Sequence, residues 1–293
     1  MTPESGESSM FGERLHRAFT ARGQLCVGID PHTWLLSEWG LPDSAAGAES
    51  FGRTVVAAAA GRVGILKPQI AFYERFGSAG YVALERVLAD ARAAGLLVIA
   101  DVKRGDLGTS VEAYADAWLT PGSSLEVDAI TVNPFMGVGS LDLSFAVAAA
   151  HGKGLFLLAA TSNPEAAVIQ QAVVARGEYA GRSVTRAILD DVAERNARST
   201  TAALGAIGVV LGATLDLSDF GIDTATAPQR ALTPVLAPGF GHQGGDIMDL
   251  ISIYGEYAGG VIVSESRSVL SAGPVRLAEA IERRVTEVGA VRG

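Results

Sequence analysis

Cysteine is nearly absent from this sequence of 293 residues, in which Cys26 is the single example. One thiol cannot close a disulfide within the chain, and such scarcity is typical of proteins from a reducing compartment. No apolar run approaches the roughly 20 residues needed to cross a bilayer, and residues 1–10 lack the basic and apolar regions of a secretory signal. We therefore expect a cytoplasmic protein with no membrane partner.

Positive charge is also scarce. The formal net charge is −9 and the chain has no basic block, so nucleic acid is not expected as a partner. Lysine is rarer than arginine, because Lys67, Lys103 and Lys153 are the three lysines among 23 basic residues. An ammonium can give up a proton in a buried site, whereas a guanidinium effectively cannot. Each lysine is therefore a candidate for a chemical role.

Eight short apolar runs recur along the chain and predict β-strands. They are apolar throughout rather than strictly alternating, which is typical of parallel strands covered on both faces. The expected strands are residues 25–29, 64–66, 97–100, 127–132, 155–160, 206–211, 235–237 and 260–263.

Segments with helical patterning alternate with these strands and predict an α/β fold. Eight alternations favour a (β/α)8 TIM barrel, which we expect to form a single domain over residues 1–293 with elaborated loops at its C-terminal face. The alternative is a doubly wound open sheet, but its glycine fingerprint is missing after the first strand. The expected helices are residues 10–21 (before the first strand), 50–61, 80–94, 109–118, 141–150, 178–204, 246–257 and 274–288, and the expected loops are 32–49 and 214–233, the latter with at most a short helix.

Charged side chains follow the first three predicted strands. Asp30 ends the first strand, Lys67 ends the second, and Asp101, Lys103 and Asp106 follow the third. Barrel closure brings strand ends to one rim, where these residues would form an alternating array that keeps a partly buried lysine protonated. The alternative is a purely structural ring of ion pairs. Unpaired buried charge is costly, so five charged residues at three strand ends favour a functional array.

A glycine-rich segment, residues 237–245, follows the seventh predicted strand, and Arg267 follows the eighth. Barrels often bind phosphate between these two loops, through backbone N–H groups and an arginine fork. Taken alone, the glycine-rich segment would fit a tight turn, and Arg267 would fit an arginine on the surface. Their occurrence at adjacent barrel positions favours a phosphate site.

The segment Asp101-Val-Lys103-Arg-Gly-Asp106 resembles the D-x-K-x-x-D signature of the orotidine 5′-monophosphate decarboxylase family. Similar segments occur in order over residues 25–270, and their order makes the resemblance specific. They are Gly28-Ile-Asp30-Pro, Leu66-Lys67-Pro-Gln, Thr161-Ser162-Asn163-Pro, and the Pro238–Gln243 loop with Arg267, while Val-Asn133-Pro-Phe-Met-Gly is similar to a longer bacterial branch of the family.

The resemblance implies decarboxylation of orotidine 5′-monophosphate to uridine 5′-monophosphate, without a cofactor or metal, in pyrimidine biosynthesis. Lys103 would protonate C6 of the pyrimidine, and Asp101 would lie against the substrate carboxylate. Asp106 would enter the neighbouring site of a homodimer. The remaining implied roles are Asp30 and Lys67 on the ribose hydroxyls, Ser162 on the ring, Gln243 and Arg267 on the 5′-phosphate, Pro238 in the phosphate loop, and Ser110 where the family usually has threonine.

Two other functions remain open from the sequence. One is a metal-dependent sugar-phosphate decarboxylase or epimerase on the same barrel, whose members resemble E-x-D-x-K. Ile99 occupies the position of that glutamate here, which weakens this alternative. The other is a non-catalytic barrel that binds a phosphorylated ligand, in which Lys103 would be dispensable.

Overall fold

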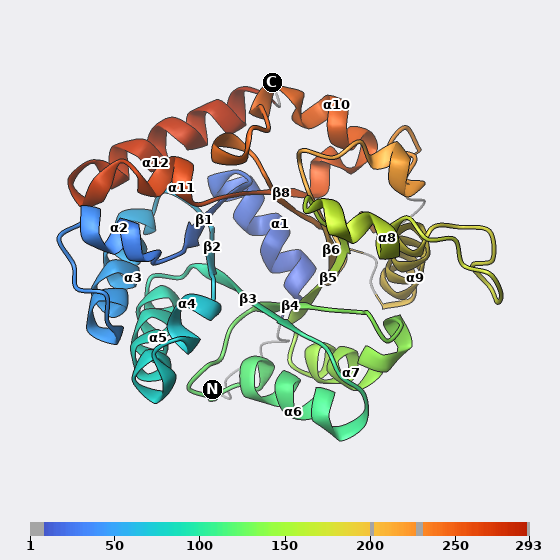
Figure 1. Ribbon diagram of the computed structural model, residues 1–293, viewed down its shortest axis with the longest axis horizontal. Helices are drawn as coiled ribbons and strands as arrows, with labels where there is room; N and C mark the ends of the chain where they lie inside the picture. Colours follow the sequence, from blue (N-terminus) through green and yellow to red (C-terminus); the bar gives the residue numbers. More distant parts are fainter. Residues whose placement is uncertain (1–8, 200–201, 227–230, 292–293) are drawn as a thin grey trace, which may run out of the picture.

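Eight parallel strands pair in sequence order and close into a barrel (Figure 1). The computed structural model describes residues 9–199, 202–226 and 231–291. Closure is made by β1 and β8, with Leu25 opposite Val263. The predicted (β/α)8 barrel is thereby confirmed. The strands are β1 Leu25–Ile29, β2 Ile65–Pro68, β3 Leu97–Arg104, β4 Ala129–Val132, β5 Gly154–Ala160, β6 Ile207–Leu211, β7 Val235–Pro238 and β8 Val261–Glu265.

Helices surround the barrel and bury its outer apolar face. Strand side chains that point outward pack with the helices in one large core, and those that point inward form a second, smaller core. The α-helices are α1 Phe11–Arg22, α2 Thr33–Glu38, α3 Ala45–Ala59, α4 Ala71–Glu74, α5 Gly77–Ala93, α6 Gly108–Leu119, α7 Asp142–Ala150, α8 Ala167–Gln170, α9 Val184–Ser199, α10 Leu250–Tyr254, α11 Arg267–Leu270 and α12 Gly273–Ala290. None of these described helices is long and apolar enough to cross a membrane.

Helix α1 closes the amino-terminal end of the barrel and crosses the centre of the ring of strands in Figure 1. Its buried residues Phe11, Leu15 and Phe19 pack on the inner core. Phe11 meets the ring of Phe156 edge-on, with 5.9 Å between centroids. A Cβ atom at Gly154 would lie only 2.4 Å from the Phe11 ring, so this close approach requires glycine. The other end of the barrel, at the carboxyl ends of the strands, is therefore the end that can form a site.

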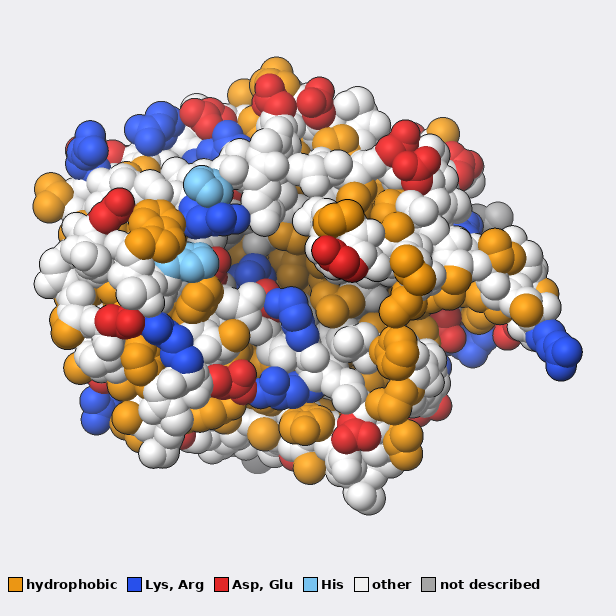
Figure 2. Space-filling model, in the orientation of Figure 1, with side chains coloured by type: hydrophobic (Ala, Val, Ile, Leu, Met, Phe, Trp, Pro, Cys, Tyr) orange, Lys and Arg blue, Asp and Glu red, His pale blue; other side chains and the backbone are white. Residues whose placement is uncertain are grey.

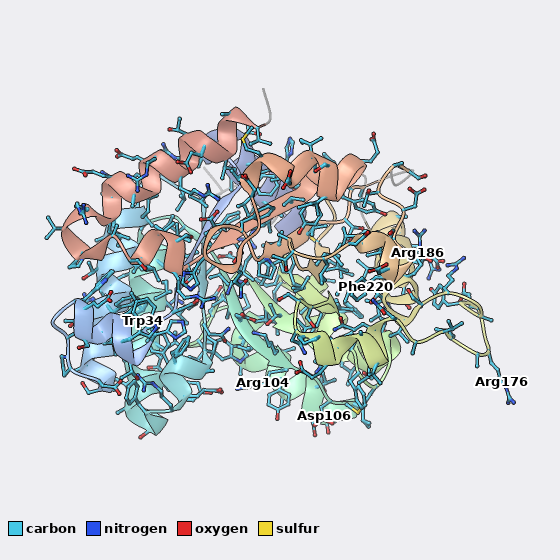
Figure 3. All side chains as sticks on the ribbon, turned by 45° about the horizontal axis from the view of Figure 1, so that its top comes forward. Trp34, Arg104, Asp106, Arg176, Arg186 and Phe220 are labelled. Atoms are coloured by element: carbon cyan, nitrogen blue, oxygen red, sulfur yellow. The ribbon has the colours of Figure 1, made fainter. Side chains whose placement is uncertain are left out.

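The helix predicted over residues 178–204 begins later than expected. An antiparallel bridge between Val173 and Ser183 forms a projecting hairpin before α9, and Arg176 lies near its tip (Figure 3). Gly177 and Gly181 have φ values of 89° and 86°, which a continuous right-handed helix does not tolerate. The predicted helix start was therefore wrong, and α9 begins at Val184.

Other predicted boundaries also need correction. The expected loop 32–49 contains α2 and the start of α3, because Leu35 and Leu36 are buried in the core and Ser44 Oγ accepts a 3.2 Å hydrogen bond from Gly47 N–H at the helix start. Strand β3 continues four residues beyond Ala100 to Arg104. The helix expected over 246–257 is broken at Gly255, whose φ is 48°. Residues 227–230 of the expected loop 214–233 lie outside the described part of the chain, and its described residues contain one short helical turn, Leu217–Phe220, as predicted.

Candidate active site

The carboxyl ends of the strands surround a cavity of about 290 Å³. Figure 2 shows this hollow with basic and acidic side chains gathered in it. Residues from all eight strands or the loops that follow them meet here, as barrel closure predicts. The predicted site residues that line it are Asp30, Lys67, Asp101, Lys103, Ser162, Pro238, Gln243 and Arg267.

The carboxylate of Asp101 lies at the centre of the charged part of the cavity and accepts four hydrogen bonds. Lys103 Nζ lies 2.6 Å from Oδ1, and Lys67 Nζ lies 3.2 Å from Oδ2. Thr131 Oγ1 donates to Oδ1 over 2.8 Å, and Gln69 Nε2 donates to Oδ2 over 2.7 Å. Each carboxylate oxygen therefore has one ammonium and one neutral donor, so the buried charge is fully paired.

Burial and neighbouring charges act in opposite directions on the pKa of Asp101 and on the pKa of Lys67. Burial alone would raise the pKa of Asp101, but the ammoniums of Lys67 and Lys103 hold it well below its usual range. Burial alone would lower the pKa of Lys67, but the carboxylates of Asp101 and Asp30 raise it above its usual value. At neutral pH the site therefore holds an ionised Asp101 beside a charged Lys67.

The backbone at Lys103 has a conformation that side chains rarely adopt. Its φ is 49°, and it is the one non-glycine residue with positive φ in the described part of the chain. The pairing of β3 with β4 shifts register between Ala100 and Arg104. This irregularity re-aims the strand end, as bulges beside active sites commonly do. Lys103 keeps its ammonium on Asp101, and its side chain is 46% exposed to the cavity mouth.

The predicted phosphate end of the cavity is formed by the loop after β7 and the start of α11. Gly239, Gly241 and Gly244 all have positive φ, with values of 123°, 70° and 98°, so the turn around Gln243 depends on glycine. Arg267 is the first residue of α11. Chain backbone and a guanidinium thus converge where an anion can bind.

A buried ion pair between Glu265 and Arg284 lies next to the start of α11. Glu265, at the end of β8, has a fully buried side chain that pairs with Arg284 of α12 and accepts a 2.6 Å hydrogen bond from Ser268 Oγ. The hydrogen bond fixes the first turn of α11, which carries Arg267, against the end of β8.

Two buried polar atoms of cavity-lining residues have no hydrogen-bond partner among the described residues. They are Asp30 Oδ1 and Ser266 Oγ. An unpaired buried acceptor or hydroxyl costs free energy unless another group satisfies it. These two atoms therefore have hydrogen-bonding capacity that the rest of the described protein does not use.

Asp106 and Ser110 do not line this cavity within one chain. Asp106 accepts a 2.9 Å hydrogen bond from the N–H of Leu107, and Figure 3 places it at the periphery of the molecule. Ser110 is exposed on α6. The cavity therefore contains four of the five charged residues that the strand ends predicted.

Gln69 and Thr131 were missed by the sequence analysis, although both contact Asp101. Gln69 follows Lys67 by two residues, and Thr131 is the polar member of the otherwise apolar β4. A polar residue within a strand that is buried throughout is a signal of an inward-facing role.

Asn133, for which no role was predicted, accepts a 3.1 Å hydrogen bond from Phe135 N–H and so stabilises the turn after β4.

In the ranges that the structure describes, no group of three or more histidine, cysteine or acidic side chains is arranged to hold a metal ion. Ile99, at the position of the glutamate in the metal-dependent alternative, is completely buried in the inner core.

Lys153 lies immediately before β5 and pairs with Glu126, with 2.8 Å between Nζ and Oε1. It is therefore at the end of the barrel opposite the cavity, away from the other two lysines.

Fold and site together define a (β/α)8 barrel with a lysine–aspartate centre and, at the other end of the same cavity, a glycine-rich loop beside Arg267. A family profile described as orotidine 5′-phosphate decarboxylase / HUMPS family matches residues 23–281. The chain belongs to this family, and it is a carbon–carbon lyase.

Named relatives and solved structures agree with this assignment. An orotidine 5′-phosphate decarboxylase of Salinispora arenicola is 49% identical over 264 residues, covering 90% of this chain and 91% of the relative. One from Streptomyces coelicolor is 48% identical over 283 residues, covering 95% and 96%. The structure of Leishmania donovani OMP decarboxylase has a TM-score of 0.75 at 25% identity, covering 97% of this chain and 98% of that one.

Proposed function

We propose that this protein decarboxylates orotidine 5′-monophosphate to uridine 5′-monophosphate and carbon dioxide in pyrimidine biosynthesis, without a cofactor, and that Lys103 protonates C6. The observation that carries this proposal is the 2.6 Å contact between Lys103 Nζ and Asp101 in a cavity that Arg267 also lines. A proton donor and an anion site thus share one cavity. The buried free thiol of Cys26 fits a cytoplasmic location.

Loss of carbon dioxide from C6 leaves an electron pair in the plane of the ring, where the π-system cannot delocalise it. A fixed ammonium beside C6 stabilises this carbanion and then donates its proton to it. Asp101 holds the Lys103 ammonium in place and, in our proposal, lies against the departing carboxylate. The free energy of binding the remote phosphate would hold the pyrimidine in that position.

The remaining cavity residues have polar groups suited to the rest of the nucleotide. The unpaired Asp30 Oδ1 would accept a hydrogen bond from a ribose hydroxyl, with Lys67 beside it. Ser162 would bind the pyrimidine. Gln243 and Arg267 would bind the 5′-phosphate, and Pro238 would shape the loop that carries Gln243.

We also propose a homodimer in which Asp106 and Ser110 complete the partner's site. Both residues lie outside the cavity of their own chain. Large apolar side chains are exposed nearby: Leu107, next to Asp106 on the loop after β3, is 59% exposed, and Phe135, on the loop after β4, is 72% exposed. The two loops are adjacent, because Asn133 N–H donates to the carbonyl of Arg104. An exposed apolar surface beside a charged loop fits a protein interface.

The direct test is to mix purified protein with orotidine 5′-monophosphate and follow pyrimidine absorbance in buffer containing EDTA. We expect the absorbance of the substrate to decline without added metal. Activity that appears only after magnesium is added would favour the metal-dependent alternative. Binding of the nucleotide with no decline in absorbance would favour the non-catalytic barrel.

A further inference from the structure

The hydroxyl of Thr131 connects the backbone of Lys103 with the side chain of Asp101. Thr131 Oγ1 lies 2.9 Å from the Lys103 backbone nitrogen and 2.8 Å from Asp101 Oδ1. Asp101 Oδ1 in turn lies 2.6 Å from Lys103 Nζ. The three residues therefore form a closed ring in which Lys103 takes part twice, once through its amide and once through its ammonium.

The direction of each hydrogen bond in this ring follows from the chemistry of the groups. A backbone N–H can only donate, and an ionised carboxylate can only accept. The hydroxyl of Thr131 must therefore accept from Lys103 N–H and donate to Asp101. A hydroxyl is suited to this position because one oxygen performs both functions, whereas a methyl group performs neither.

This ring of hydrogen bonds includes Lys103, whose backbone conformation is unfavourable. Lys103 has a φ of 49°, and β3 shifts register against β4 between Ala100 and Arg104. A non-glycine residue keeps such a conformation only where its surroundings determine it. Thr131 is 1% exposed on β4, which is hydrogen-bonded to the barrel on both sides. It is therefore a rigid point against which the end of β3 is held.

We propose that Thr131 is a positioning residue, whose hydroxyl holds the Lys103 backbone in its left-handed conformation and thereby places the ammonium against Asp101 and the reacting carbon. This inference rests on the proposed decarboxylase function and deepens it. Thr131 acts through Lys103 and Asp101, and it transfers no proton to the substrate.

The test compares Thr131→Val, which keeps the shape but removes the hydroxyl, with Thr131→Ser, which keeps the hydroxyl. We expect Thr131→Val to lower kcat about 10- to 100-fold, because small displacements of a catalytic group have effects of this size. Affinity for uridine 5′-monophosphate should stay within about threefold, since the groups proposed to bind ribose and phosphate are untouched. Thr131→Ser should keep kcat within about threefold of the wild type.

Thr233→Val is the matched control. Thr233 is completely buried, and its hydroxyl has no partner among the described residues and lies outside the cavity. Its substitution should leave kcat unchanged. The proposal is overturned if Thr131→Val keeps the wild-type kcat, if Thr131→Ser loses as much activity as Thr131→Val, or if kcat and nucleotide affinity fall together.

A crystal structure of Thr131→Val provides a readout that does not depend on activity. We expect Lys103 to leave the left-handed region and Nζ to move away from Asp101 Oδ1, and an unchanged Lys103 would overturn the inference. If the wild-type protein proved inactive towards orotidine 5′-monophosphate, the proposed function would fail, while this structural comparison would still decide the role of Thr131.

Discussion

Lys103 Nζ contacts Asp101 Oδ1 at 2.6 Å, and both residues lie within the stretch of β3 where its pairing with β4 shifts register. Two residues apart on a regular strand, their side chains would lie parallel on one face. Lys103 instead has a left-handed backbone, with a φ of 49°, and its ammonium reaches the Asp101 carboxylate from that conformation. Asp101 thereby holds the Lys103 ammonium in the cavity through one oxygen while its other oxygen binds Lys67.

Replacement of Lys103 by alanine should abolish most turnover while the fold is kept. We expect kcat to fall by about 10³-fold or more, because the proposed proton donor and the cation beside the carbanion are both removed. The measurement is initial-rate kinetics, with thermal unfolding as the check on folding. Lys153→Met is the matched control: it breaks the pair with Glu126 at the other end of the barrel and should lower Tm without lowering kcat. Equal losses of kcat in both variants would contradict the assignment.

Replacement of Arg267 by alanine should weaken binding of the phosphate. Hydrogen bonds to charged groups contribute about 1.5–3 kcal/mol, so kcat/KM for orotidine 5′-monophosphate should fall about 10- to 100-fold. Orotidine, which lacks the phosphate, should be decarboxylated equally slowly by wild type and variant. A variant that loses activity equally on both substrates would place Arg267 outside the phosphate site.

The charge of Asp101 should make stability depend on acid pH. Its pKa is lowered in the folded protein by Lys67 and Lys103, so its contribution is complete above the pKa of an unfolded aspartate, about 3.9, and is lost as the pH falls through the folded value. Asp101→Asn leaves the buried Lys67 without its nearest counter-charge and should lower the free energy of unfolding by about 3 kcal/mol at pH 7.

Urea unfolding of wild type and Asp101→Asn at pH 7 and at pH 3 measures this contribution. The difference between the two proteins should shrink at the lower pH. Asp90→Asn, which breaks an exposed pair with Arg53, is the control and should change the stability little at either pH, because exposed ion pairs contribute little. A difference for Asp101→Asn that is the same at both pH values would show that its carboxylate charge is not the source.

Sharing of Asp106 across a dimer predicts complementation between two inactive proteins. In a mixed dimer of Lys103→Ala and Asp106→Asn, one of the two sites regains both wild-type residues, since a two-fold interface exchanges the same loop in both directions. Random mixing makes half of the dimers mixed, so activity should recover to about a quarter of wild type. The assay is the rate after co-refolding of equal amounts. No recovery, with dimers present by gel filtration, would assign Asp106 to its own chain.

The sequence was sufficient to predict the barrel, because each strand is a short apolar run that is buried on both faces. It also predicted the residues at the strand ends, since charged groups such as Asp30 and Lys67 stand out against apolar surroundings. Residues such as Gln69 and Thr131 were not predicted, because a neutral side chain gains its role only from the neighbours that the fold provides. The hairpin before α9 was missed because the helical pattern of residues 184–199 continues upstream, and only the two glycines oppose it.

The packing of Phe11 against Phe156 at the amino-terminal end of the barrel determines the side from which a ligand can enter and leave. Because α1 fills that end in the described part of the chain, a ligand would reach Lys103 and leave it through the opening at the carboxyl ends of the strands. The outgoing molecule must clear the opening before the next can enter, so a loop or a neighbouring subunit that narrows the opening slows arrival and departure alike.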